Sequence, residues 1–204
     1  MPKARPAKRY FRALEHADVP AALDAVTASQ AGDAAKLCLP RFLILTAARS
    51  GEARGARWVD MDFDTNLWTI PGERMKAGRT HRVPLSAAAL AVLDQARALS
   101  DGEGLVFPGR NPGKPLSDMA LTMVLRRAGL AERTTVHGFR SAFRGWCAES
   151  GVAWEVAEAA LAHVVGNATE QAYYRTDLLE ARKPIMERWA ALALRRAAKV
   201  AALR

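Results

Sequence analysis

Hydrophobic residues recur at helical intervals over most of the chain. A helix is expected over about residues 33–46, with a kink at Pro40, because its apolar residues lie three or four positions apart. The longest helix is expected over about 178–202, where apolar side chains form one stripe. These faces comprise Leu37, Cys38, Phe42 and Leu45 in the first helix, and Leu178, Ile185, Met186, Trp189 and Leu192 in the last.

Polar residues mark the starts of other helices. Ser86 and Ser117 are suited to N-cap positions, and their helices are expected to end near Leu99 and at Gly129. Asp18 is expected to cap a short helix that carries a proline in its first turn. Two further helices are expected at about 138–149 and 153–162.

A stretch between these helical regions has the pattern of short strands. Four brief runs alternate with turn-forming residues, which predicts a small antiparallel sheet with Lys76 beside its last hairpin turn. The runs are residues 58–63, 67–70, 74–76 and 80–85. The expected fold class is therefore α+β, mostly helical, in one domain over residues 18–204.

Charge narrows the range of partners. The 204 residues include 30 Lys and Arg against 21 Asp and Glu, a net charge of +9, and residues 1–17 form a basic arm or linker remnant. Such a balance favours DNA or RNA, because neutralising phosphates releases counterions. An acidic membrane face and a merely basic soluble protein are the alternatives. The chain has neither a signal peptide nor an apolar run long enough to span a bilayer, so a cytoplasmic protein is expected.

Several kinds of site are disfavoured by composition. The two cysteines, Cys38 and Cys147, are too few for a disulfide framework or a cysteine-rich zinc site. The four histidines show no helical pairing suited to zinc, so no metal and no cofactor are expected. The five tryptophans are expected in the core: Trp58, Trp68, Trp146, Trp154 and Trp189.

One set of cationic and hydrogen-bonding residues remains as candidate chemistry: Arg49, Lys76, His137, Arg140, His163 and the pair Tyr173 and Tyr174. Two arginines can stabilise a phosphoryl transition state without a metal, a tyrosine can supply the nucleophile, and a lysine can protonate the departing oxygen. Each residue also has an ordinary structural explanation: a helix cap for Arg49, hairpin surface for Lys76, and a packed core histidine for His163.

The order of these residues resembles the catalytic domain of the tyrosine recombinases, in the phage and genomic-island integrase branch. The matching segments are LTAARSGE (45–52), MKAGRTHRVPL (75–85), VHGFRSAF (136–143), ALAH (160–163) and EQAYYRTD (170–177). The resemblance covers roughly residues 18–195.

The resemblance implies a role for each residue. Arg49 and Arg140 would hold the scissile phosphate, and Tyr173 would attack it to give a 3′-phosphotyrosyl DNA and a free 5′-hydroxyl. Lys76 would act as general acid, His137 would assist proton transfer at the nucleophile, and His163 would hydrogen-bond the phosphate. Neither ATP nor a metal would be needed. Glu52 is assigned to supporting a nearby arginine or histidine.

Two features depart from the common pattern of the family. Many relatives place the tyrosine nine residues after the last histidine, but here that position is alanine; the ten-residue spacing of the island branch selects Tyr173 and leaves Tyr174 as the alternative. The chain also lacks room before Asp18 for the domains that usually precede the catalytic one, which suggests an excised domain or a truncated product. The partner implied is double-stranded DNA at attachment sites. Full-length relatives would bind it as a homotetramer, and the isolated domain would be a monomer.

Two other functions stay open from the sequence. A type IB topoisomerase would share the chemistry but rejoin the same strand. A truncated remnant would bind DNA without cleaving it.

Overall fold

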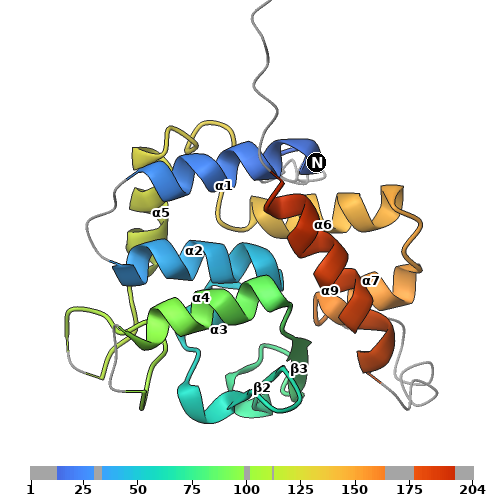
Figure 1. Ribbon diagram of the computed structural model, residues 1–204, viewed down its shortest axis with the longest axis horizontal. Coiled ribbons are helices and arrows are strands. Elements are labelled where there is room, and N and C mark those ends of the chain that lie inside the picture. Colours follow the sequence, from blue (N-terminus) through green and yellow to red (C-terminus); the bar gives the residue numbers. More distant parts are fainter. Residues whose placement is uncertain (1–12, 30–33, 99–101, 112, 164–176, 196–204) are drawn as a thin grey trace, which may run out of the picture.

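A central helix, α2 (Ala34–Thr46), runs through the middle of the molecule (Figure 1). The computed structural model describes residues 13–29, 34–98, 102–111, 113–163 and 177–195. The elements packed against α2 are α1 (Val19–Ala28), α3 (Ser50–Arg54), α4 (Ala87–Arg97), α5 (Asp118–Arg127) and α9 (Leu179–Ala193). The packing of α9 against α2 brings the last described helix beside the first half of the chain.

Aromatic side chains fill the core on two sides of α2. Phe42 of α2 packs at ring-centroid distances of 5.2 Å from Trp68 and 5.4 Å from Phe107. Trp189 of α9 meets Phe143 edge to face at 5.3 Å, and its indole nitrogen donates to the Ile44 carbonyl over 2.7 Å. Such pairs add to burial energy and fix the angle between helices. The two contacts of Trp189 hold α9 against α6 (Gly138–Glu149) and against the end of α2.

The sheet has three short antiparallel strands in sequence order, β1 (Met61–Asp62), β2 (Leu67–Ile70) and β3 (His81–Pro84). Trp68 pairs with Val83 in the register between β2 and β3, and both side chains are buried. The strand β3 also packs against α9. The predicted class, α+β and mostly helical with a small antiparallel sheet, is confirmed.

One of the predicted strands is wrong, and another is shorter than predicted. Residues 74–76 do not form a strand, because a 3-10 turn η3 (Gly72–Arg74) precedes a loop. A Cβ on Gly72 would lie 2.7 Å from the Gly78 carbonyl oxygen, so this tight loop requires a glycine there. In the segment predicted at 58–63, a 3-10 turn η2 (Trp58–Asp60) comes first and only two residues enter β1. An ion pair of 2.5 Å between Arg74 and Asp60 joins the two turns.

The helices follow the sequence pattern more closely. Ser86 and Ser117 accept the expected N-cap hydrogen bonds from Ala89 and Ala120. The helix α6 has the predicted bounds, and α7 (Trp154–Ala160) lies within the predicted range. No helix in the described part of the chain is long and apolar enough to cross a membrane.

Other helix predictions need correction. Asp18 does not cap α1 with its side chain; it closes a 3-10 turn η1 (His16–Asp18), and its carboxylate pairs with Arg133 at 2.8 Å. Trp154 is 49% exposed at the start of α7, unlike the other tryptophans. The helix α9 ends at Ala193 instead of continuing to about 202, of which residues 196–202 lie outside the described residues.

The packed domain begins earlier in the sequence than the predicted boundary at residue 18. Most of the predicted basic arm, residues 1–12, lies outside the described residues. Leu14 is buried in the core, so the packed domain includes the end of the segment predicted as an arm.

Candidate active site

Arg49 occupies the short connection between α2 and α3. Three residues later, Glu52 receives the backbone N–H of Arg49 at 2.9 Å and its guanidinium Nη1 at 2.6 Å. The Glu52 side chain is only 6% exposed, whereas that of Arg49 is 28% exposed. The buried carboxylate therefore holds a partly exposed arginine, which agrees with the supporting role predicted for Glu52.

Arg140 comes from the first turn of α6 and is held by main-chain carbonyl groups. Its Nη1 donates to the carbonyl of Ala47, just after α2, and its Nη2 donates to that of Leu161 over 2.8 Å, just after α7. Carbonyl groups at helix C-termini lack intrahelical donors and carry partial negative charge, so they suit a guanidinium. Two helix ends thus fix one arginine.

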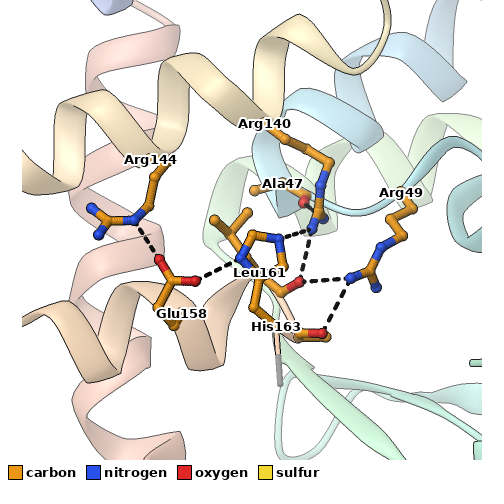
Figure 2. A network of polar contacts seen from close by, with 8 residues as sticks. Ala47, Arg49, Arg140, Arg144, Glu158, Leu161 and His163 are labelled. Carbon is orange, nitrogen blue, oxygen red and sulfur yellow. Dashed lines mark hydrogen bonds and ion pairs between the residues drawn. The ribbon is translucent and has the colours of Figure 1, made fainter. Parts of the chain in front are cut away.

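The two arginines share an anchor. The Nη2 of Arg49 donates to the carbonyl oxygens of Ala162 at 3.1 Å and of Leu161 at 3.4 Å, and Leu161 is also bound by Arg140 (Figure 2). Four segments of the chain therefore meet here: the ends of α2 and α7 and the starts of α3 and α6. Arg49 and Arg140 lie 91 positions apart in sequence, and the fold brings their guanidinium groups onto one carbonyl.

The site holds two positively charged side chains, one buried and one partly exposed. Arg140 is 4% exposed, and burial first, then the charge of Arg49, lowers its pKa to about 10 while Glu52 and Glu158 oppose this. Its buried Nε has no hydrogen-bond partner in the described part of the chain. Two adjacent guanidinium groups with unused donor capacity are suited to binding an oxyanion such as a phosphate.

His163 joins this pair from the end of α7. Its Nε2 lies 3.5 Å from Nη2 of Arg140, and its Nδ1 lies 2.6 Å from the Glu158 carboxylate. The Glu158 carboxylate also receives Nε of Arg144 at 2.5 Å. The side chain of His163 is 40% exposed, so the predicted alternative of a packed core histidine is wrong. One edge of the imidazole faces the arginine and the other faces a carboxylate.

His137 occupies the N-cap position of α6 and is exposed. Its pKa lies below the usual value because of partial burial and then the positive charges of Arg140, Arg49 and His163. A depressed pKa keeps the imidazole neutral near pH 7, in the form that accepts a proton. His137 also contacts Arg140 through the backbone, since its carbonyl accepts the N–H of Arg140 at 3.0 Å.

A further histidine, His81 at the start of β3, also lies close enough to Arg140 and Arg49 for their charges to affect its pKa. It is 9% exposed, and burial first, then Arg182, lowers its pKa to about 4, with contributions from Arg140 and Arg49. The imidazole is therefore neutral at neutral pH. The sequence does not single out His81, because the pattern of β3 shows its strand position but not its charged neighbours.

The other predicted residues are less constrained. Lys76 is exposed in the loop between η3 and β3, and within the described ranges no hydrogen bond or ion pair joins it to Arg49, Arg140 or His163. Tyr173 and Tyr174 lie outside the described residues. The structure thus brings together four of the six predicted site residues: Arg49, His137, Arg140 and His163.

Two charged residues of the site were missed from the sequence. Arg144 lies four positions after Arg140, on the same face of α6, and this spacing could have indicated it. Glu158 lies five positions before His163, which is not a helical neighbour spacing. Only the turn after α7 brings the two side chains together.

Comparison with known proteins gives a consistent result. Residues 12–179 match the sequence profile described as the phage integrase family. The prophage integrase IntA of Escherichia coli K12 is 44% identical over 156 residues, which are 76% of this chain and 38% of that protein. The chain therefore spans well under half the length of this relative.

Solved structures share the fold. The integrase from mycobacterium phage Brujita aligns with a TM-score of 0.64 at 17% identity, over 95% of this chain and 65% of that one. A lambda integrase tetramer bound to a Holliday junction aligns with a TM-score of 0.60 at 19% identity, over 85% of this chain and 51% of that one. At such identities the likeness concerns the fold alone.

Proposed function

Because the chain belongs to the phage integrase family, we propose that it is the catalytic part of a tyrosine-type site-specific DNA recombinase. The observation that carries this proposal is the meeting of Arg49 and Arg140 on the Leu161 carbonyl, with His163 beside them. Duplex DNA offers the matching group, a phosphodiester with two non-bridging oxygens. The net charge of +9 also favours a polyanionic partner.

In this proposal the arginines bind the scissile phosphate and stabilise the charge that grows on it. Guanidinium groups donate paired hydrogen bonds, and those of Arg49 and Arg140 are already fixed by carbonyl groups and by Glu52. Donors that are preorganised in this way need no rearrangement during the reaction. His163 adds a hydrogen bond to the same phosphate.

Tyr173 is the proposed nucleophile. Its hydroxyl oxygen attacks phosphorus and the bond to the 5′-oxygen breaks, which leaves a 3′-phosphotyrosyl linkage and a 5′-hydroxyl. His137 accepts the tyrosine proton, and its lowered pKa supports this role because a neutral imidazole is needed. Lys76 donates a proton to the departing oxygen, which requires its exposed loop to approach the DNA.

The reverse reaction completes strand transfer. The 5′-hydroxyl of a partner strand attacks the phosphotyrosyl bond and releases the tyrosine, so bond energy is conserved without ATP. In this proposal the two arginines stabilise the negative charge on the phosphate, without a metal ion. A homotetramer on DNA is proposed for the full-length protein, since the lambda integrase named above is a tetramer bound to a Holliday junction.

A nicked suicide substrate that carries the attachment site tests this proposal. Cleavage should trap a covalent protein–DNA adduct in EDTA, and ends should be exchanged between two duplexes. Rejoining of the original strand alone would indicate a topoisomerase instead. Binding without any adduct would indicate a non-catalytic DNA-binding remnant.

A further inference from the structure

The carboxylate of Glu158 lies directly behind His163. Glu158 is in the last turn of α7, and its side chain is 12% exposed. One carboxylate oxygen is 2.6 Å from Nδ1 of His163, and the other is 2.5 Å from Nε of Arg144 (Figure 2). A chain of charged hydrogen bonds therefore runs from Arg144 through Glu158 to the imidazole, and ends at Arg140.

The turn after α7 fixes this pairing through the backbone as well. Ala162 has a left-handed φ of 49°, and its N–H donates to the Ala159 carbonyl. The N–H of His163 donates to the carbonyl of Glu158 at 3.0 Å. These two bonds form the usual six-residue closure of a helix C-terminus. Glu158 thus holds the backbone and the ring of His163 together.

The hydrogen bonds determine which ring nitrogen carries the proton. Burial alone would raise the pKa of Glu158, but hydrogen bonds from His163 and Arg144 outweigh it, so the pKa lies below its usual value. An ionised carboxylate only accepts, so Nδ1 of His163 must donate. Arg140 only donates, so the opposite nitrogen, Nε2, presents its lone pair to the arginine when the imidazole is neutral.

A phosphate bound at the arginine pair would require Nε2 of His163 to donate a hydrogen bond instead of accepting one. Phosphate oxygens are acceptors, so an unprotonated Nε2 would face them lone pair to lone pair. With one proton taken from solvent, Nε2 becomes a donor and the imidazole a cation. The positive neighbours oppose that charge and Glu158 favours it. Among the residues that the structure describes, the charged and titratable groups around His163 are Glu158 on α7; Arg140, Arg144 and His137 on α6; and Arg49 before α3.

We propose that Glu158 is a positioning residue that keeps Nδ1 of His163 protonated and stabilises the imidazolium form, so that Nε2–H can donate to the scissile phosphate. The inference rests on the proposed function for the identity of the phosphate. Carboxylates that orient an imidazole through its second nitrogen raise its basicity in the same way at metal sites. The proton is taken up when DNA binds and returns to solvent when DNA leaves.

The direct test is a ¹⁵N NMR titration of His163 in the full chain. Glu158→Gln keeps an oxygen acceptor in place but removes the charge, so Nδ1–H should persist while the pKa of His163 falls by at least about one unit, a tenfold loss of proton affinity. Glu155→Gln is the matched control, because it removes the same charge from an exposed position on the same helix. A pKa of His163 that is equal in the two variants would overturn the proposal.

A second variant predicts a shift of opposite sign. Arg144→Gln removes a positive neighbour and leaves the Glu158 charge uncompensated, so the pKa of His163 should rise. Damage to packing alone would not move the two variants in opposite directions. A fall in Arg144→Gln would overturn the proposal even if Glu158→Gln failed to fold.

Adduct formation on the suicide substrate then links the ring to the reaction. The alkaline limb of the pH–rate profile should move to lower pH in Glu158→Gln by the shift that the titration gives. An equal loss at every pH would indicate a structural role only. If the wild type forms no adduct, the proposed function fails, whereas the titration still decides whether Glu158 controls His163.

Discussion

Arg140 is buried as a cation and held mainly by main-chain oxygens. It is 4% exposed, and carbonyl groups after α2 and α7 receive its Nη1 and Nη2. The sequence could select Arg140, because an arginine three positions after His137 at a helix start fits the family pattern. It could not select the carbonyls of Ala47 and Leu161, because main-chain acceptors leave no residue-type signal.

Replacement of Arg140 tests the anion site at the residue scale. Arg140→Ala should lower the rate of adduct formation by at least roughly 10²-fold, the size found when one preorganised donor is removed. Single-turnover cleavage of the suicide substrate measures this rate. Arg127→Ala is the control, because it removes an equal charge from an exposed position on α5.

Thermal unfolding of both variants separates folding from chemistry, since Arg140 also ties two helix ends together. A folded Arg140→Ala protein that cleaves within threefold of the wild type would rule out this arginine as a phosphate ligand.

At the scale of helices and strands, the sequence predicts correctly those features that depend only on residues within the same segment. The cap residues Ser86 and Ser117 and the bounds of α6 and β2 follow from side chains within each segment. The turns η2 and η3 do not, because contacts between distant residues stabilise them. Arg74 donates to the Gly55 carbonyl at 2.9 Å as well as pairing with Asp60, and neither partner is visible in the pattern of residues 74–76.

The contact between β3 and α9 is also built from buried polar groups that periodicity cannot reveal. Arg182 of α9 has no exposed surface; its Nη1 donates to the Arg82 carbonyl at 2.6 Å and its Nη2 lies 3.0 Å from the Asp177 carboxylate. Arg82 adds two hydrogen bonds of 2.8 Å to Asp177. This cluster fixes the start of α9 against β3 and lies beside the buried His81.

The depressed pKa of His81 predicts how stability depends on pH. The unfolded histidine binds a proton near pH 6.5, but the folded one does so only near pH 4. Between these values the unfolded state holds more protons, so the stability present above pH 6.5 is lost as the pH falls toward 4. The loss from this group is about 3 kcal/mol at 1.36 kcal/mol for each pKa unit.

Urea unfolding at pH 7 and pH 4.5 measures this effect. The free energy of unfolding should fall less in His81→Phe than in the wild type, by about 2 kcal/mol or more, because carboxylates contribute equally to both proteins. Equal losses in the two proteins would contradict a buried neutral histidine at this position.

For the whole molecule, the excess of positive charge predicts how the proposed DNA binding responds to salt. Thirty basic residues against 21 acidic ones predict binding dominated by phosphate contacts. The affinity for a duplex of arbitrary sequence should fall at least roughly tenfold between 50 and 200 mM salt. Fluorescence anisotropy with a labelled duplex measures the slope.

The basic residues before Leu14 should contribute to that slope. Deletion of residues 1–12 should flatten it, and replacement of the same basic residues by glutamine should do so equally, since charge and not chain length is responsible. These residues are Lys3, Arg5, Lys8, Arg9 and Arg12. An affinity that does not change with salt would contradict DNA as the partner.

The nucleophile is the most direct test of strand transfer by this chain. Tyr173→Phe removes only a hydroxyl, so the covalent adduct on a suicide substrate should disappear while non-covalent DNA binding persists. Tyr174→Phe is the matched control and should still form the adduct, because the ten-residue spacing after His163 selects Tyr173. Peptide mapping should find the DNA on Tyr173. An adduct that survives in Tyr173→Phe, or DNA attached to Tyr174, would contradict the assignment.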